Sequence, residues 1–219
     1  MFDETVLNML GEGLLETLYM TLASTVLAYV LGLPAGIALV VTQKDGIRPH
    51  LLANRILEVI INVLRSVPFL ILLIAVMPIT RFITGTTIGS TATVVPLVIG
   101  AAPFIARIVE SSVKEVDNGV IEAAQSMGTP TLKIICKVLL PEARPSLIVG
   151  AAIAVTTVLS FSAMAGIVGG GGLGDIAIRY GLYRYQTDIM LVTVALLIVV
   201  VQVLQGIGMK IARMSDKRK

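Results

Sequence analysis

The sequence contains few of the side chains that most enzymes use for chemistry. Its 219 residues include no tryptophan, one cysteine, one histidine and only 14% charged residues. The single cysteine, Cys136, excludes an intrachain disulfide, and the lone histidine, His50, has no nearby cysteine, histidine or carboxylate pattern for a metal. The carboxylates within the apolar stretches form no convincing acid–base pair. The composition therefore predicts no metal site, no cofactor-binding site and no catalytic residue in this chain.

Patterns that bind nucleotides and nucleic acids are missing as well. The chain has no P-loop, the pattern that holds the phosphates of ATP. The glycines from Gly169 to Gly174 contain a G-x-G-x-x-G match, but the dinucleotide fingerprint needs a strand before it, and here an apolar helix precedes the glycines. The basic C-terminal tail has no aromatic residues for stacking, so we expect no nucleic-acid partner.

The sequence does contain long apolar stretches. Hydrophobic residues make up 56% of the chain, more than one globular core of this size could bury. A helix needs about 20 apolar residues to cross a hydrocarbon core of about 30 Å. Five stretches qualify, at residues 16–41, 57–79, 88–109, 146–166 and 188–208. A β-barrel would show segments of about ten residues with alternating polarity, so we predict an all-α integral membrane protein with five transmembrane helices.

The positive charges predict the orientation. Thirteen of the 17 lysine and arginine residues fall in residues 42–56, residues 107–145 and the tail 210–219. Such residues concentrate in cytoplasmic loops, so we expect a membrane domain over residues 13–209, a cytoplasmic tail and an external N-terminal segment, residues 1–12. The acidic start does not have the features of a signal peptide. The first apolar stretch should therefore remain as a membrane helix.

Two ionisable residues lie within the second predicted span. Glu58 and Arg65 are seven residues apart and therefore fall on nearly the same face of a helix. Charged groups at membrane depth are costly and usually face protein or water. Either both side chains extend to the cytoplasmic interface, or Arg65 takes part in intramembrane ion pairing with a neighbouring helix. Arg65 to Pro68 also resembles an Arg-x-x-Pro element of amino-acid permeases in ATP-driven importers, which implies that Pro68 bends the span.

The third and fourth spans contain candidates for a translocation path. Pro96 and Pro103 flank Gly100, which leaves one face with freed carbonyls and few side chains. That face could line a passage or form a packing seam, and the sequence leaves both readings open. Met164 is a bulky, flexible side chain among small residues. It is a candidate gate, with a packing position between helices as the alternative.

The cytoplasmic loop between these spans predicts a short helix. Asp117 or Asn118 can cap a helix that runs to Met127, and Gly128 suits the positive φ of a helix stop. Pro130 can then occupy the first position of another helix. We expect two short helices separated by a sharp turn.

One side of the first short helix is apolar. The residues at helical spacing on that side are Val120, Ala123, Ala124 and Met127. A free helix of about ten residues is not stable in water, so tertiary contacts or a partner must hold it. A groove on a partner protein fits an apolar stripe of this kind. A helix that lies on the lipid surface is the alternative.

The loop also resembles a known sequence element. Glu122-Ala123-Ala124, Gly128 after three residues, and Val138 to Pro141 after nine more resemble the EAA loop, here residues 110–145, of permease subunits in ATP-driven binding-protein-dependent importers. The resemblance implies the type I ABC importer permease fold and a coupling helix that docks in a cleft of a cytoplasmic ATPase. It assigns the coupling to Glu122, Ala123, Ala124, Met127, Gly128 and Pro141.

Three further segments are similar to methionine-importer permeases in particular: TRFITGTTIG, VPLVIGAAPFIARIVE and FSAMAGIVGGGGLGDI. This likeness implies a homodimer in the lipid of a bacterial plasma membrane, two ATPase subunits that bind ATP and Mg, and an external substrate-binding lipoprotein. It also implies transport of L-methionine, extending to D-methionine or derivatives. Because nothing in helix spacing or charge encodes the substrate, a permease for another amino acid or small polar solute remains an alternative, as does a passive channel subunit.

Overall fold

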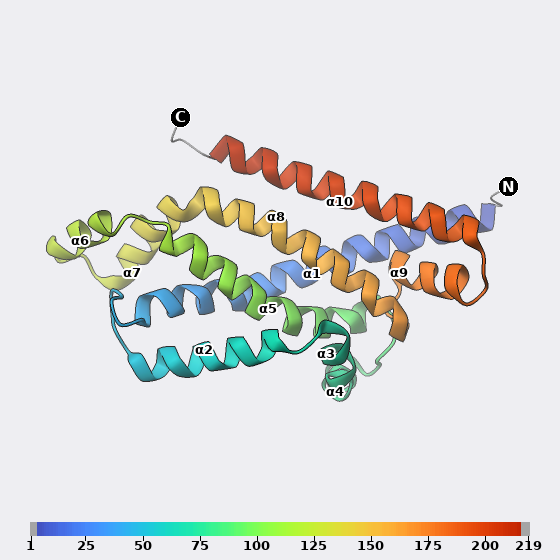
Figure 1. Cartoon of the computed structure of the whole chain (residues 1–219), viewed down its shortest axis with the longest axis horizontal. Helices are drawn as coiled ribbons and strands as arrows, with labels where there is room; N and C mark the ends of the chain where they lie inside the picture. Colours follow the sequence, from blue (N-terminus) through green and yellow to red (C-terminus); the bar gives the residue numbers. More distant parts are fainter. Residues whose placement is uncertain (1–3, 216–219) are drawn as a thin grey trace. The chain divides into compact units, whose positions relative to one another are not determined.

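Helices account for the regular structure in residues 4–215, the part of the chain that the computed structural model describes. No strand occurs among these residues, so the predicted all-α class is confirmed. In chain order the α-helices are α1 (Glu4–Thr42), α2 (Leu51–Ser66), α3 (Phe69–Ala75), α4 (Met77–Thr84), α5 (Ser90–Lys114), α6 (Asn118–Ser126), α7 (Thr131–Ile134), α8 (Leu140–Ala165), α9 (Gly172–Ile176) and α10 (Thr187–Ser215) (Figure 1). Short π-helical stretches at Ile135–Leu139 and Ala177–Leu182 and a 3₁₀ turn at Gly166–Val168 complete the set.

Four helical runs in the described part of the chain are long and apolar enough to cross a membrane. They are Glu4–Thr42, Ser90–Lys114, Thr131–Val168 and Thr187–Ser215. A fifth crossing requires α2 and α3 to act together as one broken span. The five predicted spans are reached only when this pair is counted as one.

The second predicted span, residues 57–79, is not one continuous helix. α2 ends at Ser66 and α3 begins at Phe69. Pro68 explains the break, because its ring fixes φ, here at −56°, and because proline disfavours a helical conformation in the residue before it. Its carbonyl then accepts a hydrogen bond of 3.0 Å from the N–H of Leu72, which starts α3. The bend at the proline is confirmed, and α2 and α3 make up one span only as a broken pair, bent by 101°.

The other helices extend beyond the predicted spans. α1 begins at Glu4, so the described part of the segment expected to be external, residues 1–12, is helical. α5 continues to Lys114 and α8 already begins at Leu140, so both helices enter the predicted cytoplasmic loop. α10 reaches Ser215, well into the basic tail. The remaining four residues of the tail lie outside the described part of the chain.

The chain forms two compact units, and each of the four long helices contributes to both. The first unit contains the residues up to 27, residues 67–101 and residues 155–205. The second contains residues 28–66, residues 102–154 and the residues from 206 onward. α3, α4 and α9 belong to the first unit, whereas α2, α6 and α7 belong to the second.

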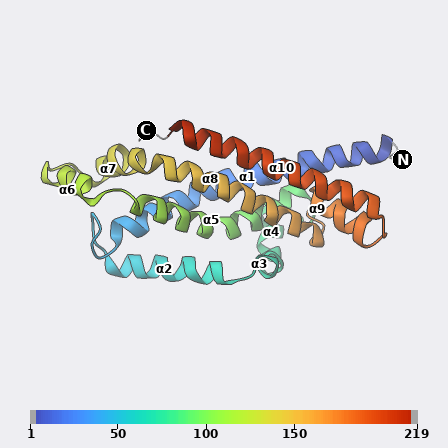
Figure 2. The same cartoon turned by 45° about the horizontal axis from the view of Figure 1, so that its top comes forward.

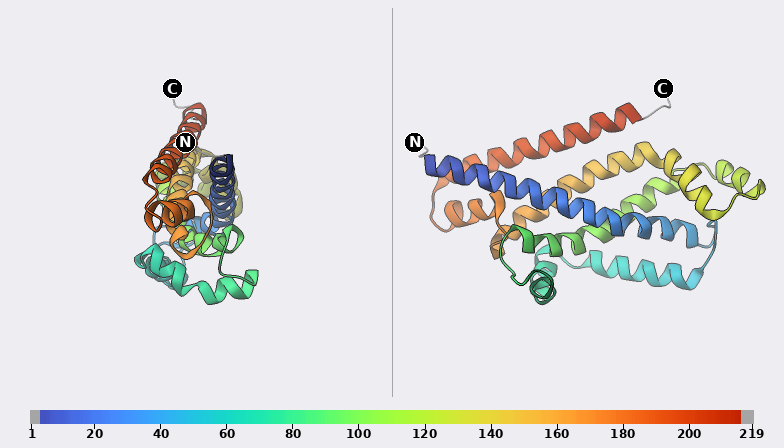
Figure 3. Two further views of the ribbon diagram at one scale, coloured as in Figure 1. Left: turned by 90° about the vertical axis from the view of Figure 1, so that its right-hand side faces the viewer. Right: turned by 180° about the vertical axis from the view of Figure 1, so that it is seen from behind.

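The core of the first unit is apolar and includes two stacked rings. Its buried cluster consists of Met20, Phe69, Leu73, Leu97 and Ala165. The rings of Phe69 and Phe161 lie parallel with their centroids 4.3 Å apart. α4 runs across the direction of the long helices of this unit, as the end-on view in Figure 3 shows.

In the second unit, α1 packs closely on α5 through two glycines. A Cβ on Gly32 would lie 2.8 Å from the carbonyl oxygen of Ala102, and one on Gly36 would lie 2.5 Å from that of Ala106. Only glycine allows the two backbones to approach so closely. The small-residue pattern on α1 therefore serves helix packing.

Candidate functional site

The start of α6 is capped by a side chain, as the sequence predicts. Asp117 has an extended backbone conformation, and its Oδ1 accepts a hydrogen bond of 2.7 Å from the N–H of Gly119. The first N–H groups of a helix have no partner within the helix, and an aspartate at the cap satisfies one of them. Of the two candidates, Asp117 and Asn118, the structure selects Asp117.

The end of α6 is a turn that depends on Gly128, which has a φ of +71°. Its N–H donates to the carbonyl of Gln125 at 2.9 Å, and the N–H of Thr129 donates to the carbonyl of Ala124 at 3.1 Å. This pair of bonds is the Schellman motif, which satisfies carbonyls left free at a helix end. The predicted stop at Gly128 is confirmed. α7 then starts after Pro130, one residue later than expected, with the proline as its cap.

The apolar stripe of α6 is largely uncovered by the rest of the chain. Ala124 is buried and anchors the helix, but Val120 is 44% exposed and Met127 is 78% exposed. Ala123 and Glu122 are exposed as well. In both Figure 1 and Figure 2, α6 projects beyond the end of α5 and the start of α8. The structure therefore presents an apolar helix face that its own unit does not bury.

A cleft of about 450 Å³ lies beside α6 within the second unit. Glu122 and Gln125 line it from α6, Lys114 from the end of α5, and Asp45 from the turn after α1. Glu122 therefore faces polar groups, while Met127 is free for a partner. Pro141, the remaining predicted coupling residue, is exposed in the first turn of α8.

Of the two readings for Arg65, the ion pair with a neighbouring helix is not present among the described residues. Glu58 faces Arg107 on α5, with 3.7 Å between Oε1 and Nη2. Arg107 also donates hydrogen bonds of 2.6 Å to Asn62 on α2 and to Glu110 on its own helix. Arg65 is exposed near the end of α2. The sequence identified the carboxylate correctly but not its partner, because the register between α2 and α5 is a tertiary property.

The path candidates on α5 lie in a packed environment. Pro96 and Pro103 are buried, and α5 continues through both. A Cβ on Gly100 would lie 3.1 Å from the ring of Phe69 and 3.3 Å from Leu72, so the glycine accommodates a neighbouring helix. This geometry favours the packing seam over an open wall at Gly100. Met164, in contrast, is 49% exposed near the end of α8.

The glycines after α8 form a tightly bonded turn. Gly169, Gly171 and Gly172 have φ of +77°, +81° and +74°, a region that other residues rarely adopt. Two consecutive residues of α1 hold this turn: Glu16 accepts from the N–H of Gly172 at 2.7 Å, and Thr17 accepts from the N–H of Leu173 at 2.8 Å. Sequence reasoning missed both. The available signal was the carboxylate of Glu16 at the edge of an apolar span, because a charged group there needs a hydrogen-bond donor from the protein.

No group of three or more histidine, cysteine or acidic side chains in residues 4–215 is arranged to hold a metal ion. Cys136 is exposed. The uncovered apolar stripe of α6 suits a protein contact.

Comparisons with known proteins agree with this reading. The sequence model of the family described as "Binding-protein-dependent transport system inner membrane component" matches residues 28–218. A protein of Vibrio cholerae named as a probable D-methionine transport system permease is 52% identical over 203 residues, which is 93% of this chain and 90% of the relative. A protein of Bacillus subtilis named as a methionine import system permease is 41% identical over 217 residues, 99% of this chain and 98% of the relative.

Solved structures show the same fold. A chain of an inward-facing methionine ABC transporter, MetNI, matches with a TM-score of 0.97 and 42% identity, covering 99% of this chain and 100% of the other. A chain of an amino acid ABC transporter matches with a TM-score of 0.78 at 20% identity, covering 98% and 100%. The second likeness shows the shared fold alone.

Proposed function

Because this chain belongs to the family of inner membrane components of binding-protein-dependent transport systems, we propose that α6 is the helix through which an ATPase drives it. The chain has the type I ABC importer permease fold and is a transport subunit, not an enzyme. The observation that carries the proposal is the uncovered stripe of α6: the helix is capped at both ends, yet Met127 is 78% exposed. A rigid, uncovered helix face is suited to a groove on a partner.

The coupling residues have separate roles in this proposal. Ala123 and Ala124 allow close approach of backbones, Met127 supplies a flexible apolar contact, and Gly128 fixes the turn into the next helix. Glu122 lines the polar cleft beside α6 and meets basic groups there or on the ATPase. Pro141 begins the connection into α8.

Transport follows from alternating access. Two copies of this chain pair with two ATPase subunits, which bind ATP and Mg, while this chain binds no cofactor. Closure of the ATPases draws the two α6 helices together and opens the passage outward, and hydrolysis reverses the movement. Each ligand favours the one of the two states, outward-open or reset, that it binds more tightly.

The substrate is methionine. The relatives named for methionine transport align over nearly the full length of this chain at 41% to 52% identity, and so does the chain of the methionine transporter. We propose uptake of L-methionine, with D-methionine or derivatives as further substrates, from an external substrate-binding lipoprotein. The chain is a multi-pass membrane protein, and the bacterial plasma membrane is its proposed location.

Met164 is the proposed gate residue. It is half-exposed, so its own chain leaves room for a partner side chain. Met164→Ala should increase methionine leak or uncouple transport from ATP hydrolysis. Unchanged flux and unchanged coupling would show that Met164 is a packing residue.

Reconstitution tests the function. The chain is assembled with its ATPase and binding protein in vesicles, and methionine uptake and ATP hydrolysis are measured separately for Glu122→Ala and Gly128→Ala. We expect uptake to fall relative to hydrolysis in both variants. Uptake without ATP in the wild-type assembly would support a passive channel, and intact coupling in both variants would remove α6 from the mechanism.

A further inference from the structure

The short helix α4 turns an apolar stripe away from its own unit. Ile79, Phe82 and Ile83 recur at helical spacing and are 51%, 91% and 61% exposed. The opposite side of the helix faces the core, where Thr80 is buried and Met77 packs against the apolar cluster. Apolar residues that point away from their own core need another apolar environment.

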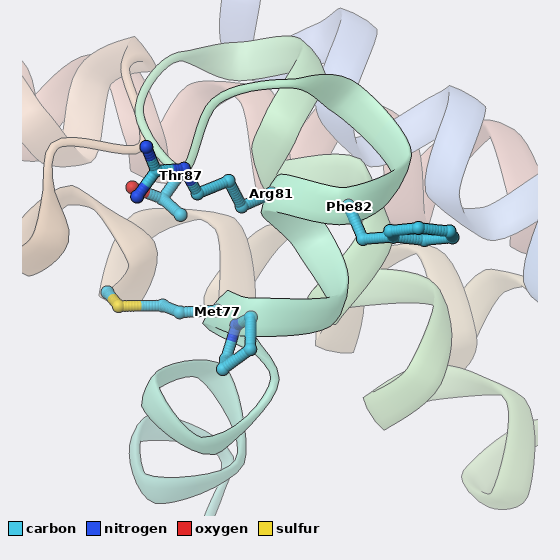
Figure 4. A pocket seen from close by; sticks show the side chains of 5 residues that line it. Met77, Arg81, Phe82 and Thr87 are labelled. Atoms are coloured by element: carbon cyan, nitrogen blue, oxygen red, sulfur yellow. The ribbon is translucent and has the colours of Figure 1, made fainter.

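A cation lies beside this stripe. A shallow pocket of about 520 Å³ is lined by Met77, Pro78, Arg81, Phe82 and Thr87. Figure 4 shows Arg81 extending toward Thr87, whereas Phe82 projects to the other side of the helix. None of the ion pairs formed within residues 4–215 involves Arg81. The guanidinium is therefore available to bind an anion.

The direction of α4 suits the boundary of a membrane. α2 has only 16 residues and reaches the length of a span only together with α3. The chain then turns at Pro68, and α4 runs across the direction of the long helices of its unit (Figure 3). A helix with one apolar side that lies across the long helices of its unit is suited to the plane of the interface.

We propose that α4 is an interfacial helix with a binding site for an anionic phospholipid. Ile79, Phe82 and Ile83 enter the upper part of the acyl chains, and Arg81 binds the lipid phosphate in the pocket that it shares with Thr87. Two features favour lipid over a protein partner. The preceding helix α3 also carries an exposed apolar side chain, Ile71, at 56%, and a phospholipid presents both an anion for the cation and acyl chains for the stripe.

The absence of tryptophan from the chain makes a direct test possible. Phe82→Trp is reconstituted with the ATPase subunits into nanodiscs, and the spectrum of the unmodified assembly is subtracted. Phospholipids brominated near the top of the acyl chain should remove about half of the emission of the new indole, because an interfacial side chain lies at that depth. The control is Tyr185→Trp, since Tyr185 is 86% exposed in the polar turn before α10 and should respond mainly to an aqueous quencher.

The headgroup is tested in the same variant. In mixed nanodiscs, brominated phosphatidylglycerol should quench at about fivefold lower mole fraction than brominated phosphatidylcholine, which corresponds to about 1 kcal/mol for one basic residue at the surface. Adding Arg81→Gln should abolish that preference, and Arg81→Lys should keep most of it. Inorganic phosphate should not compete.

Three results would overturn the proposal. The first is emission from Phe82→Trp that an aqueous quencher removes and brominated lipid does not. The second is loss of lipid quenching when the substrate-binding protein is added, which would identify a protein surface. The third is equal quenching by brominated phosphatidylglycerol and brominated phosphatidylcholine with Arg81 present, which would show that α4 has no site for an anionic headgroup.

Discussion

The carboxylate of Glu16, on α1, accepts a hydrogen bond of 2.7 Å from the backbone N–H of Gly172, the first residue of α9. The next residue, Thr17, accepts from Leu173 and donates to the carbonyl of Gly13 at 2.8 Å. The first N–H groups of a helix have no internal partner, so these side chains complete the start of α9. The glycine turn that precedes α9 is thereby fixed to α1.

We expect Glu16→Ala to destabilise the first unit by about 1–3 kcal/mol, because the N–H of Gly172 loses its acceptor. Thermal unfolding of the purified protein measures this. Glu16→Gln keeps a side-chain oxygen and should recover much of the loss. Glu12→Ala is the matched control, since Glu12 is an exposed carboxylate one turn earlier on the same helix. Equal melting temperatures for Glu12→Ala and Glu16→Ala would contradict the role of this bond.

Gly128→Ala should strain the turn after α6 by about 1–2 kcal/mol, the cost of the left-handed conformation for a residue with a Cβ. No atom lies within 4 Å of the added Cβ, so the cost comes from the backbone alone. Gly128→Asn should be milder, because asparagine tolerates this conformation. Methionine uptake per ATP hydrolysed should be lowest with alanine at position 128, intermediate with asparagine and highest with the native glycine.

Gly11→Ala provides the control for that series. Its added Cβ also meets nothing within 4 Å, but Gly11 lies inside α1 without a positive φ. Alanine should leave uptake unchanged there and raise helix stability slightly. A loss of uptake as large as that of Gly128→Ala would show that the turn conformation is not the cause.

Gly36→Ala should destabilise the second unit by about 1–3 kcal/mol, because overpacking forces the backbones apart. The added Cβ would meet the carbonyl oxygen of Ala106 and the side chain of Val109. Gly206→Ala, on α10, adds the same methyl group with nothing within 4 Å and should be neutral or stabilising. Thermal unfolding of the two variants, compared side by side, checks the close approach of α1 to α5.

Arg107→Met should cost more stability than Lys114→Met. The Arg107 side chain is 20% exposed and connects two helices, and its removal leaves Glu58 and Asn62 without their partner. Arg107 also donates to Glu110, whose side chain is only 12% exposed, and a hydrogen bond to a charged group contributes about 1.5–3 kcal/mol. Lys114 is 47% exposed and pairs with Glu110 along one helix, worth about 0.3–0.5 kcal/mol. Equal losses in a thermal unfolding assay would mean that the contact with α2 contributes nothing.

Local signals predicted the short helix α6 well. The cap at Asp117 or Asn118 and the stop at Gly128 depend on residues close together in the sequence, and short-range hydrogen bonds enforce them. The break at Pro68 was also visible, because proline acts on its own backbone and on the residue before it. The ends of the helices could not be predicted in this way. An apolar stretch shows only which residues lipid covers, whereas helical hydrogen bonds continue into the polar residues at both ends.

The sequence by itself determined that this protein is a helical membrane protein, because its long continuous apolar runs satisfy their backbone groups in lipid as helices, whereas barrel strands alternate in polarity. It also determined the capped helix α6, through residues that act over one or two turns. Only the tertiary structure decided that Glu58 faces Arg107 and not Arg65, that Gly100 accommodates Phe69, and that Glu16 holds the glycine turn. These contacts join segments distant in the sequence, and their geometry depends on how helices pack, which no local pattern encodes.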